Sequence, residues 1–162
     1  GWDDELGKKH WLEDGVWQGT REAVETIMGT TDYLEQYFAI NIVFEPLVGE
    51  LFRSGFLMQA AAANHDFITP PVISAAEADY ERNLANTIDL IYLLAHDEKF
   101  GAANKKLFQG WVNKHGALSD KAATGLQPIW SMPHSKPVAF TDVRAQSEER
   151  IGRILGELGL KR

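Results

Sequence analysis

The pattern of apolar positions is most extensive between residues 32 and 66, where a helix would be apolar on nearly every side. Its apolar residues fall into two helical rows, one of Leu34, Phe38, Ile42, Val48, Phe52 and Phe56, and one of Tyr37, Ile40, Phe44, Leu47, Leu51 and Met58. A surface helix has a single apolar stripe, whereas two such rows leave no face for water. We therefore predict a long helix that other elements surround.

The few polar residues of this stretch lie close to one line. Asn41, Glu45, Gly49 and Arg53 follow one another at spacings of four, and Glu50 stands three residues before Arg53. A charged side chain left unpaired in a protein core is strongly destabilising. We therefore predict that Arg53 pairs with Glu45 or Glu50, or that another chain supplies the partner.

Proline, glycine and capping residues divide the chain into helices. Pro46 removes a backbone hydrogen bond inside the long helix, which predicts a kink or two helices meeting near Glu45. Other start signals are the capping pair Asp32 and Glu35, and Thr69 followed by Pro70 and Pro71. The predicted helices cover residues 16–28, 32–66, 72–97, 102–130 and 141–158. No segment keeps a strand period, so the fold class is an all-α bundle.

Composition narrows the class of protein. The chain has 162 residues, no cysteine, a formal net charge of −7 and 44% hydrophobic residues, which indicates one domain over residues 1–162 with enough apolar material for a core. The acidic balance argues against nucleic acid and anionic membranes as partners. The sequence shows neither a secretory signal nor an uninterrupted apolar span, so we expect a soluble, cytoplasmic protein.

The chemistry typical of a carboxylate-bearing bundle is a di-iron centre, which requires Glu-x-x-His pairs on two helices. No Glu or Asp in this sequence is followed three positions later by His; Glu77, for example, is followed by Tyr80. The chain therefore has the pattern of a bundle without the pattern of the metal ligands.

Other candidate chemistry is weak. His65 and His96 have no second histidine one turn away, while His10, His115 and His134 stand in polar or loop-like sequence. We therefore expect capping or surface histidines and not metal ligands. Nucleophile motifs and phosphate-binding glycine loops do not occur.

Two interpretations are open for the carboxylates of Glu45 and Glu50, and two for the tryptophans. Glu45 and Glu50 fit a catalytic pair less well than an ion pair or subunit contact with Arg53. The tryptophans could line a ligand pocket, but three of them, Trp2, Trp11 and Trp17, fall in the polar first segment, where large aromatic residues more often mark a surface that packs on another chain.

Three stretches carry a resemblance to a known family. They are NIVFEPLVGELFRSGFLMQAAA (41–62), AEADYERNL (76–84) and GLQPIWSMP (125–133). With them the chain resembles, over residues 16–160, the small (beta) hydroxylase subunits of soluble di-iron multicomponent monooxygenases, and it is most similar to the propane 2-monooxygenase type. Small subunits of this family are longer at the amino end, so the chain resembles the carboxy-terminal part of one.

The resemblance implies a ferritin-like helical bundle that lacks the di-iron ligands and braces a catalytic large (alpha) subunit. It implies no cofactor on this chain, a di-iron centre in the large subunit, and a reductase that brings electrons from NADH through FAD and an iron–sulfur cluster. Further partners implied are a third small subunit and a coupling protein, in a hetero-oligomer that hydroxylates a small, propane-like hydrocarbon with O2. The contact surface expected on this chain consists of Trp17, Phe44, Glu45, Glu50, Phe52, Arg53 and Trp130.

Two other interpretations stay open. A stand-alone helical binding or regulatory module would explain the acidic composition and the missing catalytic motifs. A self-sufficient metal-dependent oxygenase would require Glu45, Glu77, Glu81 and His65 to converge without the usual ligand spacing.

Overall fold

In the computed structural model, which describes residues 4–133 and 138–162, every regular element that these residues form is helical. Trp2 and His134 lie outside the described residues. The elements outside the long central helix are α1 (Asp4–Glu13), α2 (Gly15–Met28), α6 (Thr69–Ala95), α7 (Gly101–Leu126), the 3-10 helix η3 (Gln127–Ser131) and α8 (Phe140–Glu157). The all-α class expected from the sequence is therefore what these residues adopt.

The apolar stretch forms one uninterrupted run of helical residues from 33 to 63, which we call the central helix. It consists of α3 (Tyr33–Phe38), the π-helix η1 (Ala39–Gly49), α4 (Glu50–Phe52), the π-helix η2 (Arg53–Leu57) and α5 (Met58–Ala63). It begins as predicted at Asp32, whose carboxylate accepts hydrogen bonds from the backbone N–H of Leu34 at 2.9 Å and of Glu35 at 3.2 Å.

The first π-helical stretch, η1, contains Pro46. The proline is buried inside η1, and the helix continues through it, so the alternative of two helices meeting near Glu45 is wrong. A π-turn closes its hydrogen bond one residue further along than an α-turn. We attribute the continuity to this wider turn, which leaves room for a ring that would clash in an α-helix.

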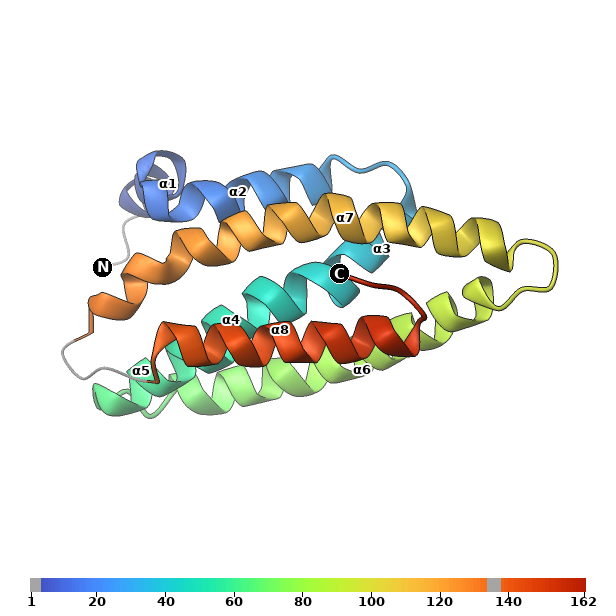
Figure 1. Ribbon diagram of the computed structural model, residues 1–162. Coiled ribbons are helices and arrows are strands. Elements are labelled where there is room, and N and C mark those ends of the chain that lie inside the picture. Colours follow the sequence, from blue (N-terminus) through green and yellow to red (C-terminus); the bar gives the residue numbers. More distant parts are fainter. Residues whose placement is uncertain (1–3, 134–137) are drawn as a thin grey trace.

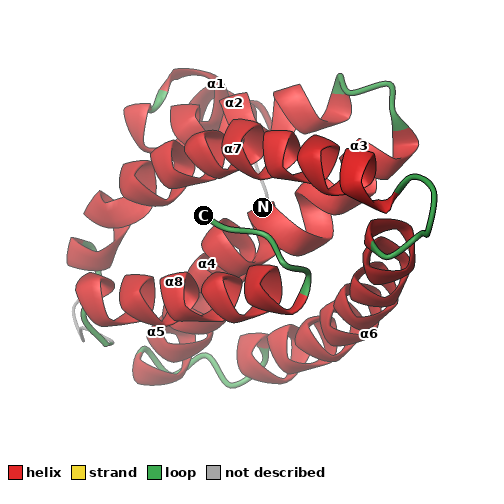
Figure 2. Cartoon of the chain, turned by 45° about the vertical axis from the view of Figure 1, so that its right-hand side comes forward, coloured by secondary structure: helices red, strands yellow, loops and turns green. Residues whose placement is uncertain are grey.

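The other helices surround the central helix on most sides. Figure 1 shows α2 and α7 side by side along one side of the molecule and α6 and α8 along the other, and Figure 2 shows the central helix passing between them. The contact between α2 and α7 is the most extensive in the bundle, and η1 packs mainly on α7 and α8. In the core the ring of Phe38 stacks on Phe108 with 5.9 Å between centroids and meets Trp111 at 5.6 Å.

Glycine permits the closest approach of α2 and α7. Gly19 of α2 is buried, and a Cβ atom at this position would lie 2.8 Å from the backbone oxygen of Lys121 and 3.0 Å from Cα of Ala122. Such distances are shorter than atoms in contact tolerate, so a side chain here would force the two helices apart.

Several helix ends differ from the prediction. The helix expected from Thr69 starts there, but Asp66 does the capping, because its carboxylate accepts from the N–H of Ile68 at 2.9 Å and of Thr69 at 3.0 Å. The expected helix over 102–130 ends its α-helical part at Leu126 and continues as η3. Helix α1 was not predicted at all, since it buries none of its residues and therefore has no apolar stripe to recognise.

Among the residues that the structure describes, no helix combines the length and the apolar character that crossing a lipid bilayer requires.

Candidate subunit-contact site on the central helix

The polar line of the central helix forms an ion triad with α6, which we call the first triad. Arg53 donates from Nη2 to Oε2 of Glu45 at 2.6 Å and from Nε to Oε1 of Glu77 at 3.0 Å. The three side chains keep 27%, 21% and 20% of their surface exposed, so the triad is only partly screened by water. The predicted pairing of Arg53 with Glu45 is confirmed, and Glu77 is an additional partner.

Gly49 allows this triad to form. A Cβ atom at Gly49 would lie 2.7 Å from Cδ of Glu45 and 2.9 Å from Nη1 of Arg53. The spacing of four residues holds Glu45, Gly49 and Arg53 in one row along the widened helix, and the missing side chain lets the flanking charged groups close over it. The pair of Glu45 and Arg53 is therefore set by the local sequence, whereas Glu77 is supplied by α6.

A second triad links the central helix to α6 and α8. Arg150 of α8 lies with Nε 3.0 Å from Oε2 of Glu50 and with Nη2 2.5 Å from Oε1 of Glu81. Its guanidinium also stands 5.8 Å from the ring centroid of Tyr80, whose hydroxyl donates to the backbone oxygen of Asn41 at 3.3 Å. Glu50 therefore pairs with Arg150, and not with Arg53 as the alternative prediction had it.

The environment of Glu50 favours its neutral form. The pKa of Glu50 is raised to about 7, and burial is the largest cause. The charge of Arg150 opposes this rise, those of Glu77 and Glu81 add to it, and that of Arg53 opposes it. The Nε–H of Arg150 makes no hydrogen bond despite its 3.0 Å distance to the carboxylate, so this ion pair is a charge contact without good alignment. Burial nevertheless outweighs the opposing charge of Arg150.

Aromatic rings connect three of the predicted contact residues, Trp17, Phe52 and Trp130. The successive centroid distances are 6.4 Å for Trp11 and Trp17, 5.7 Å for Trp17 and Phe52, 5.9 Å for Phe52 and Phe56, and 4.7 Å for Phe56 and Trp130. We call these five residues the aromatic chain. It ties α1, α2, the central helix and η3 together, so much of the tryptophan surface expected to face another chain is used inside this one.

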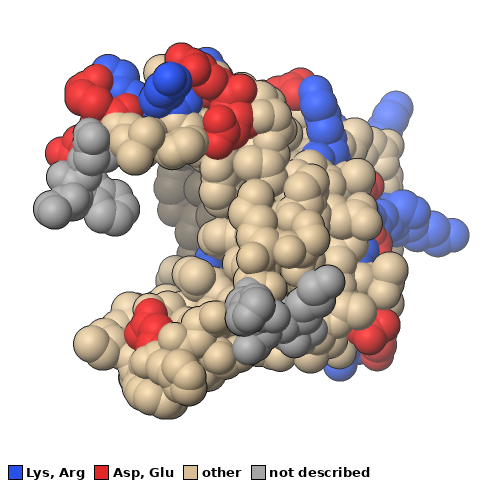
Figure 3. Space-filling model, turned by 90° about the vertical axis from the view of Figure 1, so that its left-hand side faces the viewer, with Lys and Arg blue, Asp and Glu red and all other residues tan. Residues whose placement is uncertain are grey.

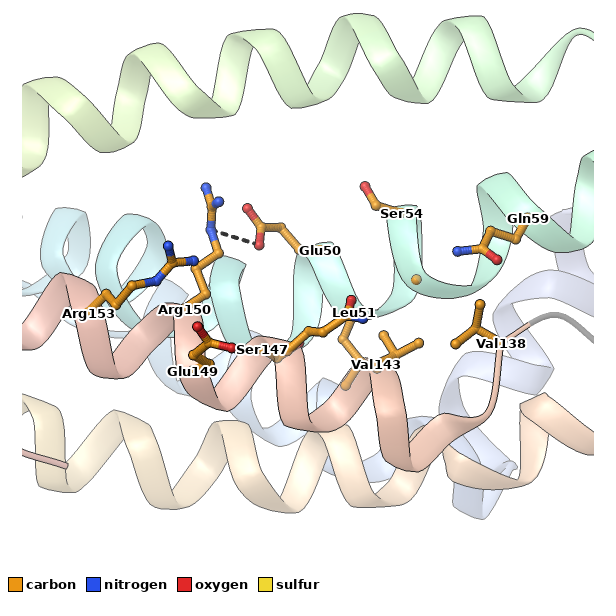
Figure 4. Close-up of a pocket in the computed structure, with 12 residues that line it drawn as sticks. Glu50, Leu51, Ser54, Gln59, Val138, Val143, Ser147, Glu149, Arg150 and Arg153 are labelled. Atoms are coloured by element: carbon orange, nitrogen blue, oxygen red, sulfur yellow. Dashed lines mark ion pairs between the residues drawn. The ribbon is translucent and has the colours of Figure 1, made fainter.

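A pocket of about 480 Å³ lies between the central helix and α8. Figure 4 shows Glu50, Leu51, Ser54 and Gln59 on one side of it and Val143, Ser147, Arg150 and Arg153 on the other, with the ion pair of Glu50 and Arg150 at one end. The residues that line it include no histidine or cysteine, and they carry charges of both signs. This lining suits water and ion pairs better than an apolar substrate.

One polar cluster escaped the sequence reasoning. His115 of α7 is fully buried, and its Nε2 lies 2.9 Å from Oε1 of Glu35, which Lys114 also contacts at 2.7 Å. Burial is the main cause that lowers the pKa of His115. Its expected polar or loop-like surroundings are therefore wrong. The sequence predicted that Glu35 caps its own helix as a pair with Asp32. Instead, the carboxylate of Glu35 contacts His115 and Lys114, and Asp32 caps the helix.

The carboxylates of the two triads do not fit a metal centre. Glu45 and Glu77 are bound by one guanidinium, Glu50 and Glu81 by another, and Tyr80 stands where a Glu-x-x-His pair would place the imidazole. Across residues 4–133 and 138–162, no cluster of His, Asp and Glu side chains has the arrangement to hold a metal ion. His65 does not join these carboxylates in any such cluster.

The all-helical chain matches a family of hydroxylases. A family model described as methane, phenol and alkene hydroxylase matches residues 1–98. The chain belongs to this family.

Individual relatives agree with this assignment. The chain is 42% identical over 156 residues to the hydroxylase small subunit of propane 2-monooxygenase from Gordonia sp. (strain TY-5), covering 96% of this chain and 42% of the relative. It is 30% identical over 118 residues to the beta chain of methane monooxygenase component A from Methylosinus trichosporium, covering 71% of this chain and 30% of the relative. The chain thus spans less than half the length of these relatives.

A solved structure extends the comparison to the fold. A chain of toluene 4-monooxygenase, in a structure with toluene bound in the resting active site, superposes with a TM-score of 0.67 at 28% identity, covering 76% of this chain and 40% of that chain. The predicted resemblance and the predicted all-α, ferritin-like bundle are both confirmed.

Proposed function

We propose that this chain is a structural part of the small subunit in the hydroxylase component of a di-iron monooxygenase that hydroxylates a small, propane-like hydrocarbon with O2. The observation that carries the proposal is the 42% identity, over nearly the whole chain, to a subunit named for that role. We further propose that the chain corresponds to the carboxy-terminal part of such a subunit, as one domain.

In this proposal the chemistry takes place on other chains. The large subunit holds the di-iron centre, and a reductase delivers electrons from NADH through FAD and an iron–sulfur cluster, with a coupling protein and a third small subunit as further components. This chain contributes packing surface. Its commitment of Glu45, Glu77, Glu50 and Glu81 to arginines supports a bracing role rather than a catalytic one.

The seven predicted contact residues stay a prediction. Trp17, Phe44 and Phe52 are half-buried and keep surface for a partner, whereas Trp130 is only 7% exposed and has little left to offer. Phe44 and Phe52 are neighbours in sequence of Glu45 and Arg53 of the first triad, and Trp17 of α2 contacts Phe52.

The test is native mass spectrometry combined with metal analysis on the assembly isolated through a tag on this chain. We expect a hetero-oligomer that contains a larger hydroxylase chain, with iron bound to that larger chain. An iron-free monomer would favour a stand-alone binding module, and iron bound to this chain alone would overturn the argument from the arginine-bound carboxylates.

A further inference from the structure

One face of the central helix lacks a covering helix. Its η1 segment packs mainly on α7 and α8, and it has lesser contacts with α6 and α2 on its flanks. Figure 3 shows the resulting hollow, between a charged lobe at the place of α1 and α2 and a mostly uncharged lobe at the place of α5 and the start of α6. We call this hollow the open groove.

The floor of the open groove has the character of a core. Its apolar residues keep part of their surface exposed: Ile40 is 37% exposed, and Phe44 and Phe52 are half-buried. The other sides of the central helix are apolar too, but other helices cover them. Phe52 touches Trp17 of α2, and Arg53 reaches Glu77 of α6, so the row from Ile40 to Phe52 runs between these two flanking helices. An apolar floor between two helices is suited to a further amphipathic helix.

The first triad specifies the charge of what binds there. Glu45 and Glu77 both pair with Arg53, so these three side chains carry a net charge of −1 when they are ionised. A segment that covers the groove removes water from this charge. It must therefore supply a cation or hydrogen-bond donors in return, or else leave an uncompensated charge buried.

We propose that the open groove is the docking site of an amphipathic helix from the same subunit, supplied by the portion that the relatives possess and this chain does not match. The relatives have more than half of their length outside the match, so polypeptide of this kind is available to them. The docked helix presents apolar side chains to Ile40 and Phe44 and a Lys or Arg to the carboxylates of the first triad.

Charge argues against a second copy of this chain as the occupant. A two-fold dimer brings the same patch of both chains together. Two first triads of net negative charge would then face each other across an apolar contact, which is unfavourable when water is excluded. The large subunit is the other candidate, and the experiment separates it from the proposed occupant.

The absence of cysteine gives a clean probe. Ile40→Cys and, separately, Phe44→Cys place a single thiol in the groove, and Ala117→Cys places one on the exposed side of α7 as the control. Each variant is made in the 162-residue chain and in a chimaera that joins the unmatched part of the Gordonia small subunit to this chain. The rate of reaction with a fluorescent maleimide is measured for both forms.

We expect the groove thiols to react about tenfold or more slowly in the chimaera than in the 162-residue chain, with Ala117→Cys unchanged, because a docked helix must open before reagent enters. Equal rates in both forms overturn the proposal. Protection that appears only after the large subunit is added assigns the groove to that subunit, and this result also overturns the proposal. Concentration-dependent protection of the 162-residue chain alone assigns it to a second copy, with the same consequence.

The charge requirement is tested in the same system. Adding Glu45→Gln to the chimaera removes an anion that the docked cation contacts, so protection of the thiol at position 40 decreases, while the 162-residue chain shows no such change. An undiminished protection overturns the predicted cation. These measurements need neither iron nor the large subunit, although the choice of occupant rests on the proposed subunit identity. Their failure is therefore distinguishable from failure of the proposed function.

Discussion

Glu50 makes the stability of the protein depend on pH. Its pKa is raised from an ordinary value of 4.5 to about 7, chiefly by burial, so the folded state holds a proton that the unfolded state releases between these pH values. Stability from this residue is therefore complete below about pH 4.5 and decreases as the pH rises through about 7. The groups that face Glu50 and set this balance are Arg150, Glu77, Glu81 and Arg53.

Glu50→Gln removes this dependence. We expect the variant to gain about 2 kcal/mol of unfolding free energy relative to the unmodified chain between pH 5 and pH 8. Urea unfolding at a series of pH values measures the difference, and it cancels contributions from His115 and other groups that both proteins share. Glu98→Gln, in the exposed turn after α6, is the control and should show a flat difference. A flat difference for Glu50→Gln as well would mean that the carboxylate is ionised when folded.

Within residues 4–133 and 138–162, Arg53 is the one cation that pairs with both Glu45 and Glu77, and we expect its removal to lower stability. Arg53→Met keeps most of the side-chain stem but leaves two carboxylates close together, which should lower the unfolding free energy by about 2 kcal/mol. The control is Arg82→Met, because Arg82 and its partner Asp79 are 72% and 66% exposed. A change of at most about 0.5 kcal/mol is expected there. Equal effects for both variants would contradict a special role for the first triad.

At the scale of elements, the contact between α2 and α7 depends on Gly19. Gly19→Ala should lower the unfolding free energy by about 2 kcal/mol, since its methyl group would press on the backbone of Lys121. Gly110→Ala is the matched control, because a Cβ atom there meets nothing within 4 Å. It should raise stability by up to about 1 kcal/mol through helix propensity. Thermal unfolding followed by circular dichroism compares them, and a stabilising Gly19→Ala would mean that the helices are not in close contact.

The elements show where sequence reasoning succeeds. Two apolar rows predicted the central helix and its burial, and the spacing from Glu45 to Arg53 predicted the first pairing, because both signals are local. The continuity of the helix through Pro46 was not predictable in the same way. Proline terminates an α-helix, and the π-turns that accommodate it have no sequence signal of their own.

The partners that were missed are distant in sequence. Arg150 reaches Glu50 across the bundle, and His115 reaches Glu35 from another helix. Neither pair follows a helical spacing, so only the packing of α7 and α8 against the central helix reveals them. In the candidate site, the residues of the central helix were therefore predictable, whereas the arginine that completes the second triad was not.

At the scale of the whole molecule, the central helix is the element that the others enclose, and α1 lies at the opposite extreme. The central helix is flanked by α2, α6, α7 and α8 and supplies fully buried residues such as Phe38, Ile42 and Leu47. Helix α1 buries none of its residues and is held chiefly through contacts with α2. Local stability should follow this difference, because amides exchange through whichever opening is least costly.

Native-state hydrogen exchange followed by mass spectrometry should therefore show different amide protection in α1 and in η1. Amides of α1 should exchange through local opening, with a protection free energy of at most about 2 kcal/mol, while those of η1 should exchange only with global unfolding. The open groove does not weaken this expectation, because backbone hydrogen bonds of a helix are internal to it and α7 and α8 hold the opposite face. Covering the groove should then raise the protection of η1 together with the global stability while leaving α1 unchanged. Exchange of η1 ahead of α7 would instead show that the central helix opens on its own toward the groove.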